Sequence, residues 1–98
     1  MRFARSVQFQ IKPGKNQEFT RLLNDEVLPT LKRQDGFHEE LALLEGERAI
    51  GISVWNDQKS AEKYHSTVYP KMLEKLTPVI NGTPKVETFG VAATAVAG

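Results

Sequence analysis

With 98 residues, the chain has room for one domain, predicted to span residues 1–98, whose small core would gain from burial against a partner subunit. Its 13 Lys and Arg against 12 Asp and Glu leave a net charge of +1, which argues against a nucleic-acid partner, and the lack of cysteine excludes disulfides, thiolate metal sites and a cysteine nucleophile. No apolar run approaches the ~20 residues of a membrane helix and no signal peptide is visible, so we expect a cytoplasmic protein without a membrane partner.

The first third of the chain predicts a strand followed by a bent helix. Apolar residues alternate with other residues from Phe3 to Ile11, which is the period of a half-buried strand, and the Pro-Gly pair at 13–14 ends it. From Asn16 the apolar spacing becomes helical. Pro29 should kink or restart this helix, and Gly36 is a natural residue to end it.

A β-hairpin is predicted in the middle of the chain. Apolar residues alternate within 37–44 and again within 48–55, and the short segment 45–47 between them has the composition of a tight turn. One face of the later strand carries Ile50, Ile52 and Val54, and the other carries Gly51, Ser53 and Trp55. The pattern does not decide which of these two faces is turned inward.

The last third predicts a second bent helix and a final strand. The Asn56-Asp57 pair is suited to cap a helix whose apolar stripe covers residues 61–76 and which bends at Pro70. The segment 77–84 is rich in Pro, Gly and Asn, and predicts a loop. Residues 86–96, rich in Thr, Val and Ala, predict the last strand.

The resulting order β-α-β-β-α-β predicts an α+β, ferredoxin-like fold, an antiparallel sheet with helices on one face. If the other face carries Trp55 and Leu44, part of it is too apolar for water, and a second sheet would cover it. The uncharged tail from Val91 would be an adhesive edge if it stayed free. We therefore predict a homodimer that associates through the sheet face and the C-terminal strand; the alternative for the tail is a frayed terminus.

Motifs along almost the whole chain point to one family. They are Phe9-Gln-Ile-Lys-Pro-Gly-Lys15, Glu18-Phe19, the kinking Pro29, Asp35-Gly-Phe37 and Ile52-Ser-Val-Trp55. In these motifs the chain resembles the antibiotic biosynthesis monooxygenase family of dimeric α/β-barrel proteins. Its members include cofactor-independent oxygenases of quinols and polyketides, heme-degrading monooxygenases and proteins without known activity. The resemblance implies that the two sheets of a dimer pack face to face into a barrel, and that a pocket lies between each sheet and its own helices.

The resemblance also assigns side chains to that pocket. Its strand wall would be formed by Val7, Phe9, Ile52 and Val54 or by their alternates. The residues predicted to bind the substrate, a small apolar, aromatic or quinol-like molecule, are Phe9, Phe19, Leu23, Trp55 and Met72.

The predicted catalytic residues are His65, Tyr64 and Tyr69. A cofactor-independent oxygenase needs a dry pocket, a base that converts a phenol or quinol into its anion, and donors that hold the developing charge. His65 is the natural base at neutral pH, and the two tyrosines would shape the site; no cofactor and no metal are expected. Alternatively, His65 only edges its helix and the aromatic residues form core. The protein would then be a non-catalytic small-ligand-binding or dimerisation module of the same fold.

Three other functions fit less well. The heme-degrading branch shows an Asn on the first strand and a Trp and a His on the second helix, but this chain has no Asn on that strand and no His near 72–74. His38 and Glu40 share a strand face and could touch a metal, although two histidines in the whole chain argue against a dedicated site. Strand 48–55 resembles an RNA-recognition signature, but Ile50 and Ile52 stand where stacking aromatic residues are required.

Overall fold

The computed structural model describes residues 1–97 of the chain and confirms the α+β, ferredoxin-like fold. The elements are β1 (Phe3–Ile11), α1 (Asn16–Leu22), the π-helix η1 (Leu23–Val27), α2 (Leu28–Lys32), β2 (Phe37–Glu45), β3 (Arg48–Trp55), α3 (Gln58–Thr67), α4 (Tyr69–Leu76), the 3-10 turn η2 (Thr77–Val79) and β4 (Ile80–Gly90). Two helical segments, 16–32 and 58–79, thus connect the strands as the predicted order requires. None of the described helices is long and apolar enough to cross a membrane.

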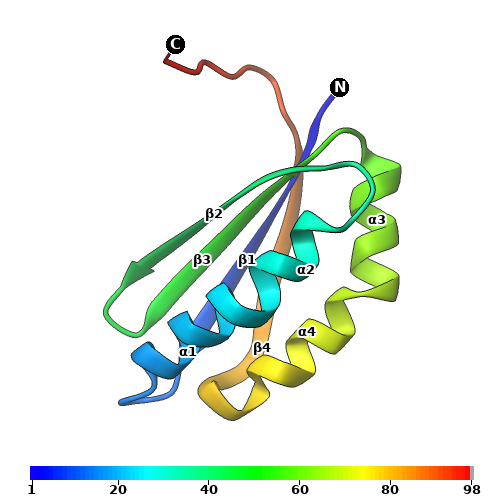
Figure 1. Cartoon of the computed structure of the whole chain (residues 1–98). Helices are drawn as coiled ribbons and strands as arrows, with labels where there is room; N and C mark the ends of the chain where they lie inside the picture. The colour runs from blue at the N-terminus through cyan, green and yellow to red at the C-terminus, as the bar shows by residue number, and fades with distance from the viewer. Residues whose placement is uncertain (98) are drawn as a thin grey trace.

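The four strands form one antiparallel sheet in the order β2-β3-β1-β4. All helices lie on one face of this sheet (Figure 1), and both chain ends leave from the same end of it. The backbone N–H of Val91 donates to the carbonyl of Arg2 at 2.9 Å, which holds the two ends together. The helices thus cover one face of the sheet, and we call the opposite face, which they leave uncovered, the open face.

The strand register decides which side chains face the helices. Val7 pairs with Gly51 and Arg5 pairs with Ser53, and all four are buried. The inward wall from β3 is thus the alternate set, and Ile52 and Val54 point to the open face. Alternation alone could not settle this, because both faces of β3 carry apolar residues.

The first helix is divided into three pieces, because Pro29 interrupts its hydrogen bonding. A proline has no N–H and its ring conflicts with the carbonyl four residues earlier, here Asp25. The chain widens into the π-helical turn η1 over that stretch and continues as α2 from Leu28. The predicted interruption at Pro29 is confirmed. The π-turn is placed so that Leu23 and Val27 both reach toward the sheet.

The second helix begins at a side-chain cap and breaks in its middle. The Asp57 carboxylate accepts from the backbone N–H of Ser60 at 2.8 Å, which confirms the predicted cap. Val68 separates α3 from α4, whose first turn contains Pro70. The predicted loop at 77–84 is only partly correct, because β4 already begins at Ile80 and absorbs the Asn-Gly pair in an irregular register with β1.

The core lies between the sheet and the helices. Its fully buried large side chains are Trp55, Phe19, Ile11 and Leu76, one from each of four elements. Burying such side chains contributes about 1.5–3 kcal/mol each. Phe19, Val27 and Leu31 of the first helical segment are buried here, and Leu22 and Leu23 are partly buried against them.

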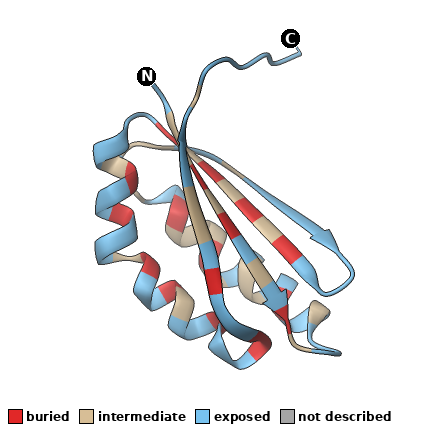
Figure 2. Ribbon diagram, turned by 180° about the vertical axis from the view of Figure 1, so that it is seen from behind, coloured by how far each residue is buried: buried red, intermediate tan, exposed pale blue. Residues whose placement is uncertain are grey.

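The open face of the sheet is not covered by any described element (Figure 2). Leu41, Leu43 and Phe89 are 56%, 47% and 54% exposed on it. The residues expected to make this face apolar are different ones. Trp55 is fully buried on the helix side, and Leu44 pairs with Ala49 and so shares the helix-facing parity.

The end of the chain also differs from the expectation. The last strand ends at Gly90, and residues 91–97 form neither helix nor strand in the single chain. They have no neighbouring strand to pair with in this monomeric structure, so their backbone groups have no ladder to join. The final part of the predicted strand, 91–96, is therefore wrong for the isolated chain.

Candidate functional site

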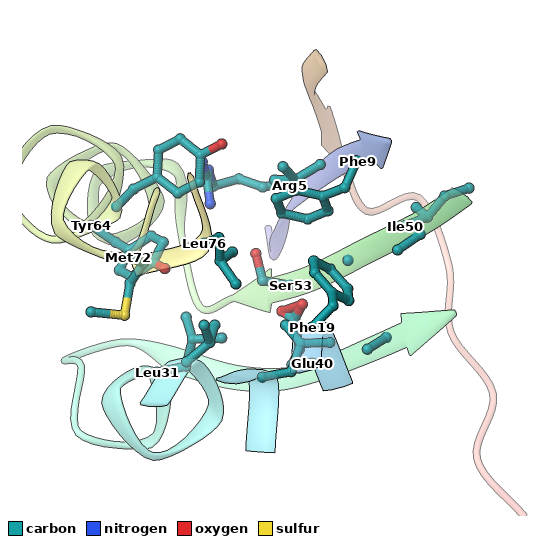
Figure 3. A pocket seen from close by; sticks show the side chains of 17 residues that line it. Arg5, Phe9, Phe19, Leu31, Glu40, Ile50, Ser53, Tyr64, Met72 and Leu76 are labelled. Atoms are coloured by element: carbon teal, nitrogen blue, oxygen red, sulfur yellow. The ribbon is translucent and has the colours of Figure 1, made fainter. Parts of the chain in front are cut away.

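A small cavity lies between the sheet and the helices (Figure 3). Its apolar wall comes from Val7 and Phe9 on β1 and from Phe19, Leu23 and Met72 on the helices. Its volume of about 40 Å³ is close to that of one water molecule. A cavity that holds a benzene ring measures about 150 Å³, so an aromatic ligand requires the helices to move outward.

Arg5 reaches into this apolar space from β1 and is only 3% exposed. Its guanidinium lies over the rings of Tyr64 and Tyr69, at 5.2 and 4.7 Å from their centroids. One terminal nitrogen, Nη2, lies 3.0 Å from Nδ1 of His65, while Nε has no hydrogen-bond partner. Burial lowers the pKa of Arg5, against the opposing effect of the neighbouring tyrosines. The cavity therefore contains a buried cation with unused hydrogen-bonding capacity.

Tyr64 and Tyr69 close the cavity at its Arg5 end. Burial raises the pKa of Tyr64 to about 12 and also raises the pKa of Tyr69, while Arg5 opposes both shifts. Both phenols are thus neutral donors at physiological pH. The buried hydroxyl of Tyr69 has no hydrogen-bond partner. Together with Nε of Arg5, it is a second donor left free beside the cavity.

Glu40 enters the same cavity from the edge strand β2 (Figure 3). Burial raises the pKa of its carboxyl group to about 7, and Arg5 only partly opposes that shift. Arg5 and Glu40 do not form an ion pair, because no guanidinium nitrogen of the one lies within 4.0 Å of a carboxylate oxygen of the other. A Cβ atom on Gly51 would lie 2.8 Å from Oε1 of Glu40, so the carboxyl rests against this glycine.

His65 lies outside the cavity, on the other side of Arg5. Its side chain belongs to an outer groove that also includes Phe3, Val86 and Arg5 itself. The imidazole stacks on the Tyr69 ring with centroids 5.4 Å apart and planes inclined by 16°. Burial lowers the pKa of His65, and the positive charge of Arg5 adds to this effect. A neutral His65 can accept from Arg5 and thereby hold the guanidinium between the groove and the cavity.

The structure brings most of the predicted site residues together. Those that line the cavity are Phe9, Phe19, Leu23, Met72, Tyr64 and Tyr69. Trp55 lies behind them: its ring packs on Tyr64 at 5.0 Å, and its Nε1 donates to Oγ of Ser53 at 2.9 Å. His65 is exposed and contacts the site through Arg5 and through its stacking on Tyr69.

Two charged residues of the cavity were missed as site residues by the sequence analysis. Arg5 shares the strand parity of Phe3 and Val7, and Glu40 was considered only as a metal ligand. A charge that interrupts the buried face of a strand is the signal that could have identified both, because such a group is rarely buried without a function. For Glu40 this reasoning also requires the face of β2 to be known, which the hairpin register supplies.

The described residues contain no group of three or more His, Cys, Asp or Glu side chains that could hold a metal ion. The polar atoms of the cavity are a guanidinium, a carboxyl and hydroxyls, and two of the donors are without partners. This arrangement can bind an organic molecule that carries an acidic oxygen, and can exchange a proton with it.

Comparison with protein-family models finds one match. Residues 2–72 match the model described as antibiotic biosynthesis monooxygenase. The matched range includes β1, the hairpin and the helix that carries Tyr64 and His65. No curated protein matches the sequence.

Solved structures with the same fold include one named enzyme. SnoaB, a cofactor-independent oxygenase from Streptomyces nogalater, is 18% identical with a TM-score of 0.80, and the alignment covers 95% of each chain. A protein of unknown function from Nitrosomonas europaea is 16% identical with a TM-score of 0.82, over 99% of this chain and 95% of that one. A conserved protein from Methanosarcina mazei Go1 is 19% identical with a TM-score of 0.76, over 91% of both. At these identities the likeness concerns the fold.

Proposed function

The chain belongs to the antibiotic biosynthesis monooxygenase family, and from this premise we propose that it is a cofactor-independent monooxygenase of a small phenol- or quinol-like aromatic molecule. The observation that carries the proposal is the buried Arg5, whose Nε lacks a hydrogen-bond partner beside a largely apolar cavity. A buried cation that forms no close ion pair is costly, and an anionic ligand in direct contact with it lowers that cost. The family match and the fold shared with a cofactor-independent oxygenase support the same reaction class.

The chemistry needs no cofactor when the substrate itself supplies the electrons. A phenol that loses its hydroxyl proton becomes an electron-rich anion that can reduce O₂. One oxygen atom then forms a new bond to the ring carbon, the carbon–hydrogen bond there is broken, and the second oxygen leaves as water. A phenol and O₂ thus give a quinone and water, with four electrons passing from the ring to oxygen.

The residues of the cavity serve this reaction by holding charge and excluding water. Nε of Arg5 and the hydroxyl of Tyr69 would donate to the oxygen on which the negative charge develops. Phe9, Phe19 and Met72 would contact the ring of the substrate. In this proposal His65 is a positioning residue, because its imidazole contacts Arg5 and not the cavity.

Oxygen consumption by the purified protein tests the proposal. A panel of small phenols and quinols is offered in an oxygen electrode, with quinone formation followed by absorption. Arg5→Met keeps an apolar side chain of similar length but removes the cation, and should lower kcat/KM by about 10- to 150-fold, since a charge-assisted hydrogen bond contributes roughly 1.5–3 kcal/mol. Arg2→Met, at an exposed arginine of the same segment, is the matched control and should retain full activity. Equal activity of the two variants would refute the role of Arg5.

The second candidate function is a non-catalytic ligand-binding or dimerisation module, and the open sheet face favours its dimerisation part. Leu41 and Leu43 on β2 and Phe89 on β4 are apolar side chains exposed on this face, which water does not favour. We propose that a second copy covers this face and that the tail from Val91 pairs across the interface. Ligand binding without any oxygen uptake would support the module over the enzyme. A cytoplasmic location stays a prediction.

A further inference from the structure

We infer that Glu40 is the general base of this site, and that its carboxylate takes the hydroxyl proton of the substrate while Arg5 stabilises the resulting anion. The inference rests on the proposed function, because it names the group that begins that reaction. It assigns the base to the edge strand β2 and not to the helix that carries His65.

The strand register places the two charged groups in one row. Arg5 pairs with Ser53 on one side, and Glu40 pairs with Ser53 on the other. Adjacent strands lie about 4.8 Å apart, so the backbones of Arg5 and Glu40 flank Ser53 at roughly twice that distance. All three side chains line the cavity. A ligand above Ser53 therefore has a cation on one side and a carboxyl group on the other.

Gly51 makes room for the carboxyl group of Glu40. A Cβ at this position would come within 2.8 Å of Oε1 of Glu40 and 3.9 Å of the Phe9 ring. The glycine thus leaves the space through which the Glu40 side chain folds over the sheet beside the ring of Phe9. The neighbouring residue Glu39 shows the contrast, because it is exposed and its carboxylate lies 3.7 Å from His38.

The surroundings of Glu40 adjust it to the task of a base. Burial among apolar side chains raises its pKa to about 7, while the charge of Arg5 limits that rise. A base with a pKa near the working pH is ionised often enough to act and basic enough to hold the proton. The ionisable side chains that share the cavity with it are Arg5, Tyr64 and Tyr69, and both tyrosines stay neutral at this pH.

The proton transfer balances within the site. The oxygen–hydrogen bond of the substrate breaks, the proton bonds to a carboxylate oxygen of Glu40, and the electron pair stays on the substrate oxygen. The net charge of the occupied cavity does not change, because the carboxylate is neutralised as the substrate becomes an anion. Glu40 later returns this proton to the reduced oxygen that leaves as water.

Proton accounting with 4-nitrophenol, whose anion is yellow, tests the inference without any turnover. The probe is bound at a pH just below its own pKa, and calorimetry in buffers of different ionisation enthalpy counts the protons released. In the wild type we expect a yellow bound probe with almost no proton released, because Glu40 receives it. In Glu40→Gln the bound probe should stay colourless or release one proton for each anion formed. Equal colour and equal proton release in the two proteins would overturn the inference, as would a wild type that binds no phenol.

Two further variants separate the position of the carboxyl group from its mere presence. Glu39→Gln removes the adjacent exposed carboxylate and should behave as the wild type. Gly51→Ala keeps Glu40 but displaces its carboxyl group, and should resemble Glu40→Gln. Because Gly51 does not have a positive φ, alanine is compatible with its backbone. If Gly51→Ala behaves as the wild type, Glu40 does not act from the position described.

Turnover distinguishes failure of the inference from failure of the proposed function. With an active substrate, Glu40→Gln should lower kcat by about 10²–10⁴-fold and abolish the loss of rate on the acidic side of the pH profile. A rate within a few-fold of the wild type, with that acidic limb retained, would overturn the role of Glu40 and leave the oxygenase in place. Internal proton transfer to Glu40 without oxygen uptake would instead support the base and refute the oxygenase.

Discussion

Gly36→Ala should disturb the joint between β2 and α3 far more than an alanine at a comparable glycine. Gly36 has φ of +80°, which costs an L-residue about 1–2 kcal/mol. A Cβ there would also lie 2.5 Å from Cβ of Ser60, in the first turn of α3. Overpacking of this kind costs about 1–3 kcal/mol, so the whole substitution should lower the free energy of unfolding by about 2–5 kcal/mol.

Gly14→Ala is the matched control for this experiment. Gly14 has φ of +77°, but a Cβ there would meet nothing within 4 Å, so only the backbone cost applies. Thermal unfolding followed by circular dichroism, at one protein concentration, should place the Tm of Gly36→Ala at least about 4 °C below that of Gly14→Ala. The double variant Gly36→Ala/Ser60→Gly should recover part of the difference. Equal losses for Gly36→Ala and Gly14→Ala would show that the contact with Ser60 does not constrain the fold.

The remaining predictions concern pH, the histidine and the dimer. Burial raises the pKa of Glu40 from 4.5 to about 7, because the folded state favours the neutral carboxyl group. The stability that this preference contributes is fully present below pH 4.5 and is lost as the pH rises to about 7. Glu40→Gln should therefore flatten the change of stability with pH in this window, and its free energy of unfolding in urea above neutral pH should exceed that of the wild type by up to about 3 kcal/mol. His65→Phe should abolish most turnover by releasing Arg5, yet leave the Tm nearly unchanged; undiminished kcat would remove His65 from the mechanism. Leu43→Glu places a charge on the open sheet face and should raise the dimer dissociation constant in sedimentation experiments, whereas an unaltered constant would exclude this face as the interface. Deleting residues 94–98 should also weaken the dimer, and an unchanged constant would show that the tail is passive.

The element order could be predicted from the sequence because most elements have a clear period and a clear boundary. Alternation defined β1, and the helical spacing that includes Phe19 and Leu31 defined the first helix, with Pro29 marking its interruption. The end of the chain was less accessible. Residues 91–96 have strand composition, but a strand needs a neighbour, and the described chain offers none there.

The site was predictable only as far as packing could reveal it. Aromatic residues such as Phe9 and Tyr64 lie at the cavity, because their spacing places them on inward faces, and their roles there stay predictions. His65 directly follows Tyr64 on the helix, and the apolar spacing could not show that its side chain faces the outer groove and not the cavity. Glu40 was hidden because its neighbourhood depends on Gly51 and Ser53, which lie across the hairpin and not beside it in sequence.

The tight cavity under the π-helical turn has a consequence for kinetics. A space of about 40 Å³ admits no aromatic ring, so the conformation that receives one is a minor state of the free protein. The observed dissociation constant is then weakened by the fraction of molecules that are open. Association should saturate with ligand concentration at the opening rate of the segment Leu23–Val27, whose side chains cover the cavity. The same slow opening would keep bulk water away from the substrate anion during its lifetime in the site.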